Sequence, residues 1–218
     1  MPRTRNSDVE IPEVPLDLRG KLDPKNLSWD LYIRGCMTEE KVAGHIQHLL
    51  ALDNSNIPGE INIFLLSGGG ETSAGYALID IMTSCKHTIR TIALGDVCSM
   101  AAFTFIAGTP GNRIIGQRAL LMFHPISSTH IDTAQPYLED SMVGNRITKS
   151  YGDALLNSRT SITKEAFEKQ QNGELWLRPA EAIQMNMAEK MITDSKVIDK
   201  IYSKLRTPRQ AREIKAVQ

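Results

Sequence analysis

Short apolar runs alternate along the chain with segments in which apolar residues recur every three or four positions. The runs are typical of buried strands, and the periodic segments are typical of amphipathic helices. The pattern predicts strands at 31–33, 61–66, 88–94, 113–115 and 119–123. It predicts helices at 38–52, 73–82, 99–107 and 134–157. The alternation of strands and helices indicates an α/β fold with a mainly parallel sheet covered by helices.

Two of the predicted helices carry clear apolar stripes. In the first, Thr38 stands at the N-cap position, and four apolar residues follow at helical spacing: Val42, Ile46, Leu49 and Leu50. The helix at 134–157 is longer, and its stripe comprises Leu138, Met142, Ile147, Tyr151 and Leu155. Such a stripe packs either on its own domain or on another subunit.

The chain of 218 residues fits a single domain, which we expect over 29–205. Residues 1–28 contain four prolines among charged residues, which predicts an extended N-terminal arm. Residues 206–218 are polar and basic, and we expect a solvated C-terminal tail there.

The amino-acid composition argues against several classes of function. Lys and Arg (25) balance Asp and Glu (25), so nothing favours binding to nucleic acid or to an anionic membrane. No stretch approaches the ~18 apolar residues of a membrane helix, and the N-terminus does not resemble a signal peptide. Three cysteines without CxxC spacing indicate reduced thiols and a cytoplasmic protein. No residue spacing suggests a metal, and no cofactor is expected.

Residues that could take part in catalysis stand at the ends of predicted strands. Three glycines, 68–70, follow the strand at 61–66, Ser99 lies between a strand and a helix, and His124 ends the strand at 119–123. A serine hydroxyl becomes a nucleophile when a base removes its proton, and imidazole is suited to that task near neutral pH. Backbone N–H groups of the glycines and of Met100 could stabilise an oxyanion. The combination favours a serine hydrolase site.

Each of these features also has a purely structural interpretation. Ser99 could simply cap the following helix, and the three glycines could form a flexible turn. Cys98 beside Ser99 is best explained as a small packing residue. The GxSxG motif of α/β-hydrolases is absent, as are the glycine motifs of nucleotide-binding loops.

Four motifs in order resemble the ClpP family of self-compartmentalising serine peptidases. They are Gly69-Gly70, then Gly95-x-x-x-Ser99-Met100-Ala101-Ala102, then Met122-Phe123-His124-Pro125, then Pro179-Ala180-Glu181-Ala182. The similarity runs from about residue 29 to residue 192. It implies a crotonase-like fold, two stacked heptameric rings (a tetradecamer) that enclose the active sites, and substrates that are peptides or unfolded proteins. It also implies a ring-shaped unfoldase ATPase as partner.

The resemblance assigns roles to individual residues. Ser99 would be the nucleophile, His124 the base and Glu174 the third member of the triad. The N–H groups of Gly70 and Met100 would form the oxyanion hole. The helix at 134–157 would be a protruding handle that interlocks the two rings.

The chain departs from the family pattern at several positions. Gly68 replaces the proline of the family motif Asn-Ser-Pro-Gly-Gly, and Pro125 follows His124 directly where the family has Gln-Pro. Glu174 stands where the family has Asp, with Asp153 and Asp132 as less suitable substitutes. Residues 1–28, which form the axial gate in the family, match almost nothing. Such departures are typical of a divergent copy, for example one encoded by a phage.

Three functions are therefore weighed. The first is an ATP-dependent serine endopeptidase acting inside a ring-shaped oligomer. The second is a structural subunit with little or no activity that modifies a host protease ring, which the changes at Gly68 and Glu174 favour and the presence of Ser99 and His124 disfavours. The third is an acyl-CoA enzyme of the crotonase type, for which Glu71 is the candidate acid or base.

Overall fold

The computed structural model describes residues 28–55, 57–124, 135–163, 173–194, 196, 198 and 199, and for 135–143 it describes the backbone only. Several sequence predictions lie outside the described residues: the arm at 1–28 except for Ser28, the tail at 206–218, Pro125 and Asp132. The same holds for the side chains of Leu138 and Met142 in the long helix.

The described strands form one sheet, and the predicted α/β class is confirmed. The main path runs β1 (Asp30–Met37), β2 (Glu60–Gly70), β3 (Thr88–Cys98), β4 (Arg113–Gly116) and β7 (Lys190–Ile192). Off this path, β5 (Leu120–Phe123) pairs with β3 and with β6 (Leu175–Leu177). All pairs are parallel except β5–β6. Strand β3 is therefore the branch point, since its first half pairs with β4 and its last residues pair with β5.

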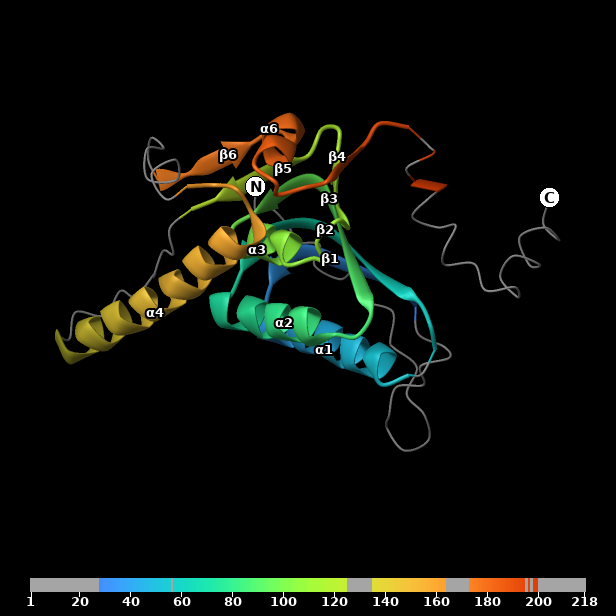
Figure 1. The fold of residues 1–218 in the computed structure, drawn as a ribbon. Helices are drawn as coiled ribbons and strands as arrows, with labels where there is room; N and C mark the ends of the chain where they lie inside the picture. Colours follow the sequence, from blue (N-terminus) through green and yellow to red (C-terminus); the bar gives the residue numbers. More distant parts are fainter. Residues whose placement is uncertain are drawn as a thin grey trace, which may run out of the picture.

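The described helices lie on more than one side of this sheet (Figure 1). They are α1 (Glu39–Asp53), α2 (Thr72–Ser84), α3 (Met100–Ile106), α4 (Gln135–Arg159) and α6 (Pro179–Gln184). Helices α1 and α2 lie side by side, while α4 extends away from the rest of the chain. The core forms between the helices and alternate strand residues such as Leu31, Ile33, Ile63 and Leu65, all of which are buried.

One residue of the apolar stripe predicted for the helix at 38–52 does not face the core. Leu50 is 41% exposed, because Leu49 and Leu52 occupy the core-facing positions of α1. Thr38 is the N-cap residue of α1, as predicted, but its side chain makes no capping hydrogen bond. The N–H of Glu39 instead donates to Glu71 Oε2 at 3.1 Å, so a carboxylate from the end of β2 takes the capping role.

Strands β2 and β3 are longer than predicted because they continue through their glycines. The register with neighbouring strands shifts between Arg34 and Cys36 in β1 and between Leu65 and Ser67 in β2. Extra residues inserted into a paired strand form bulges, which redirect the chain without ending the strand. The three glycines thus belong to the end of β2 and not to a free turn.

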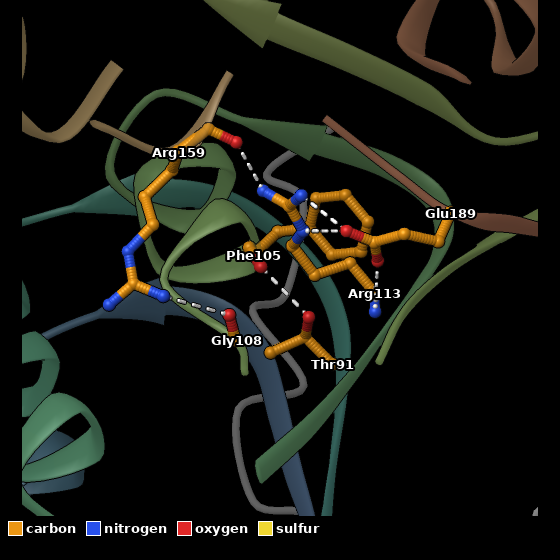
Figure 2. Close-up of polar contacts among 6 residues, drawn as sticks. All are labelled: Thr91, Phe105, Gly108, Arg113, Arg159 and Glu189. Atoms are coloured by element: carbon orange, nitrogen blue, oxygen red, sulfur yellow. Dashed lines mark hydrogen bonds and ion pairs between the residues drawn. The ribbon is translucent and has the colours of Figure 1, made fainter. Parts of the chain in front are cut away.

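A buried arginine joins four segments that are distant in sequence (Figure 2). Arg113, at the start of β4, is 2% exposed and donates through Nε to Glu189 Oε1 at 2.8 Å and through Nη1 to the Arg159 carbonyl at 2.6 Å. Its backbone N–H also donates to Glu189 Oε2. Arg159 in turn donates to the carbonyl of Gly108 behind α3. This network fixes the last residue of α4 to the sheet.

Candidate active site

Three neighbouring strands end at the predicted active-site residues. In the β3–β5 register Cys98 lies beside Met122, and Ser99, the next residue after β3, donates its N–H to the Met122 carbonyl at 2.7 Å. In the antiparallel β5–β6 register Met122 faces Trp176 and Phe123 faces Leu175. His124 is the residue after this last pair on β5, and Glu174 is the residue before that pair on β6. The sheet thus brings Ser99, His124 and Glu174 to one edge.

Ser99 occupies a strained turn between β3 and α3. Its φ is 54° and its ψ is −128°, a backbone conformation that residues with a Cβ rarely adopt. Its side chain makes no capping hydrogen bond to α3, so the interpretation of Ser99 as a simple helix cap is not supported. A nucleophile on a strained strand-to-helix turn is the arrangement that exposes a serine hydroxyl in α/β-hydrolases.

The end of β2 lies directly against this turn. A Cβ on Gly69, whose φ is +95°, would come within 2.8 Å of Ser99 Cβ and 2.9 Å of Met100 N. A Cβ on Gly70 would lie 2.4 Å from the Met37 carbonyl oxygen of β1. Both positions therefore require glycine. Gly68, by contrast, has no atom within 4 Å of its Cβ position.

The buried Ser67 holds the glycines in place. Its hydroxyl donates to the Gly35 carbonyl and accepts the N–H of Gly69 at 3.1 Å. The Gly69 N–H is thus directed into the bulge. Of the two predicted oxyanion donors, Gly70 follows this bulge and Met100 is the first residue of α3. The first intrahelical hydrogen bond of that segment comes later, from Ala102 N to the Ser99 carbonyl.

Glu174 is exposed and lies immediately before β6. Its Oε2 accepts a hydrogen bond from Trp176 Nε1 at 3.0 Å. Burial raises the pKa of the Cys98 thiol, and the negative charges of Asp96 and Glu174 raise it further. The carboxylate of Glu174 therefore acts electrostatically on the residue that precedes Ser99, and the Cys98 thiol stays protonated.

Other candidate acids have different surroundings. Asp153 lies on α4 and pairs with Lys149 at 2.6 Å, away from the strand ends. Glu71, the candidate of the acyl-CoA hypothesis, accepts the α1 N–H already described. Asp132 is outside the described residues.

The remaining described histidines lie away from the sheet edge at which β3 and β5 end. His45 and His48 sit on α1, where burial lowers the pKa of both imidazoles. Nε2 of His48 is 2.7 Å from the Ser28 carbonyl, and Nε2 of His87 is 3.2 Å from the Leu52 carbonyl. Within the part of the chain that the structure describes, no cluster of His, Cys, Asp or Glu residues could hold a metal ion. In that same part, no helix has the length and apolar character needed to cross a bilayer.

Sequence reasoning missed Trp176. The segment Glu174-Leu175-Trp176-Leu177 alternates between exposed and buried residues, which is the period of a strand, but three residues are too few to stand out. That alternation, which puts Glu174 and Trp176 on one face, was the signal available.

Most of the chain is similar to proteins of one known family. The family model described as Clp protease matches residues 28–195. An ATP-dependent Clp protease proteolytic subunit from Mesostigma viride is 26% identical over 164 residues, which is 75% of this chain and 71% of the relative.

Proposed function

This chain belongs to the Clp protease family, and we propose that it is a serine endopeptidase that cleaves peptides or unfolded polypeptides. The observation that carries the proposal is the strained Ser99 turn at the sheet edge where the strand of His124 also ends. We also propose a crotonase-like fold, which the mainly parallel sheet and the projecting α4 support.

The proposed reaction proceeds through an acyl-enzyme. His124 takes the proton of Ser99 Oγ while the oxygen attacks the carbonyl carbon of the peptide bond. The N–H groups of Gly70 and Met100 stabilise the resulting oxyanion. The protonated imidazole then gives its proton to the leaving amine, and the peptide C–N bond breaks. Water, deprotonated by His124, hydrolyses the ester and restores Ser99.

In this mechanism Glu174 holds the imidazole in the correct orientation and stabilises the imidazolium that forms. Its place directly before the last β5–β6 pair, which His124 directly follows, supports that role. The longer side chain of Glu, relative to the Asp of the family, requires something to fix the carboxylate.

We propose that the chain assembles into stacked heptameric rings and that α4 makes the contact between them. Ile147 is 48% exposed and Tyr151 is 56% exposed, so part of the predicted apolar stripe faces away from the domain. The base of the helix is firmly docked: Tyr76 Oη donates to the Thr148 carbonyl at 3.2 Å, and Gly152 packs against Tyr76 and Phe103. Ile147 and Tyr151 lie on these same docked turns, and Tyr151 also packs edge-to-face against Tyr76. A docked helix that keeps an exposed apolar side chain such as Ile147 suits contact with another subunit.

A ring-shaped unfoldase would need a separate apolar surface, and the sheet offers one. Tyr32 and Phe64 stack with ring centroids 5.0 Å apart, next to the exposed side chains of Leu66 and Leu94. Tyr32, Phe64 and Leu66 alternate with buried residues of β1 and β2, so they lie on the sheet face turned away from the core. Leu94 follows the buried run of β3 and is exposed as well. We propose this patch as the docking site of the unfoldase.

The experiment that tests the function is fluorophosphonate labelling of the purified protein, with peptide cleavage and native mass measured on the same sample. We expect the wild type and Ser158→Ala, which changes an exposed serine on α4, to be labelled. Ser99→Ala should lose both labelling and cleavage while it keeps the native mass. An assembled wild type that is not labelled would overturn the proposal in favour of the structural subunit.

A further inference from the structure

A side chain that the family resemblance does not assign lies beside the proposed triad. Trp176 of β6 and Glu174, which directly precedes β6, are two residues apart and both exposed. Trp176 pairs with Met122 of β5, and His124 directly follows that strand. The Trp176 indole is 48% exposed, and its Nε1 donates to Glu174 Oε2 at 3.0 Å.

The hydrogen bond from Trp176 restricts the Glu174 side chain, which is longer and more flexible than an aspartate. A glutamate has one more rotatable bond than an aspartate, and ordering an exposed glutamate side chain costs conformational entropy. A hydrogen bond to an ionised carboxylate is among the stronger ones in proteins. The indole side chain has only two rotatable bonds and is held by its strand, so it can fix the carboxylate at low cost.

The chemistry of the indole also determines which oxygen remains for the imidazole. An indole nitrogen donates a hydrogen bond and cannot accept one, so it cannot compete with Glu174 for the Nδ1 proton of His124. Because Trp176 takes up one lone pair of Oε2, both lone pairs of Oε1 stay available to an imidazole donor.

We propose that Trp176 is a positioning residue that orients the Glu174 carboxylate toward His124 and thereby makes a glutamate effective where the family has an aspartate. This inference rests on the proposed peptidase function. Trp176 touches neither substrate nor the reacting atoms in this scheme, and it acts only through Glu174.

The test is Trp176→Phe, which keeps an aromatic ring and removes the N–H. We expect kcat for a short peptide, and the rate of fluorophosphonate labelling, to fall about tenfold with KM unchanged, since a hydrogen bond to a charged group is lost. The acid limb of the pH profile of kcat/KM should move to lower pH, because the imidazolium loses an oriented carboxylate. Arg178→Ala, an exposed change two residues further on, should behave as the wild type.

A second pair of variants separates positioning from packing. In a Glu174→Ala background, Trp176→Phe should have no further effect on kcat or on the pH profile, because the residue through which it acts is gone. Unchanged kcat in the single variant, or an equal tenfold loss in the Glu174→Ala background, would overturn the role of Trp176 while the peptidase function stands. A wild type that is not labelled at all would overturn both.

Discussion

The backbone of Gly69 touches the backbone turn at Ser99, so closely that residue 69 has no space for a Cβ. The end of β2 and the β3–α3 turn therefore form one rigid unit, and the proposed nucleophile and oxyanion donors are positioned by backbone packing. This explains why a glycine can replace the family's proline at position 68, where the Cβ position is open.

The two adjacent glycines give the sharpest test of this unit. Gly69→Ala should abolish peptidase activity, because its methyl group would displace Ser99 and Met100 and because its φ of +95° disfavours any side chain. Gly68→Ala should retain most of the activity, since nothing lies within 4 Å of the added carbon. Steady-state peptide cleavage by both variants, with native mass recorded, makes the comparison. Equal activity of the two variants would contradict the contact.

The backbone strain at Ser99 should change the free energy of unfolding of variants at this position. Ser99→Gly should be more stable than Ser99→Ala by about 1 kcal/mol, because only glycine adopts φ 54° without cost. Both variants should be inactive. Thermal unfolding of the two proteins at equal concentration measures the difference, and a less stable glycine variant would argue against the strained turn.

Glu174 should affect the rate and not the binding of substrate. Glu174→Ala should lower kcat substantially with little change in KM, while Ser99 remains reactive at a reduced rate because the oxyanion donors remain. Glu174→Asp should be intermediate, since the shorter side chain moves the carboxylate away from Trp176 Nε1. The measurement is steady-state kinetics on one peptide. An unchanged kcat in Glu174→Ala would remove this residue from the triad.

The exposed side chain of Ile147 on α4 should control assembly. Ile147→Asp places a charge on a side chain that is half exposed in the single chain and, in our proposal, buried between rings. Light scattering should then show single rings or smaller species, because an unpaired charge is costly to bury. Ile147→Leu keeps the apolar surface and should keep the native mass. If Ile147→Asp has the native mass of the wild type, α4 does not join the rings through this residue.

The three cysteines should differ in reactivity. The thiolate is the reactive form, and burial together with a hydrogen bond to Asp53 raises the pKa of Cys85 to about 12. The pKa of Cys98 is raised as well, while Cys36 is exposed. At pH 8, iodoacetamide should modify Cys36 alone in the folded protein and all three cysteines in urea. Intact mass counts the modifications, and early loss of the Cys98 thiol would contradict its burial.

The sequence proposes Ser99 and His124 as site residues because local signals mark them: a residue of the right chemistry at the end of an apolar run. It could not show that Gly69 touches Ser99 or that φ of Ser99 is positive, because both follow from the packing of β2 against the β3–α3 turn. Leu50 fits the helical period of α1, yet the position of the sheet decides which leucines are covered. Strand β6 forms because β5 offers an edge to pair with, and this pairing fixes the place of Trp176.

The bonds of Arg113 span 46 residues to Arg159 and 76 residues to Glu189. Contacts of such long range form late, after most of the chain has collapsed. During synthesis, α4 leaves the ribosome well before Glu189. Until the sheet is almost complete, Arg113 therefore lacks its carboxylate partner, and the last turn of α4 is not held by that ion pair. We therefore expect α4 to be held in place only in fully synthesised and folded chains. Through its bonds, the buried side chain of Arg113 would then make assembly depend on the completion of folding.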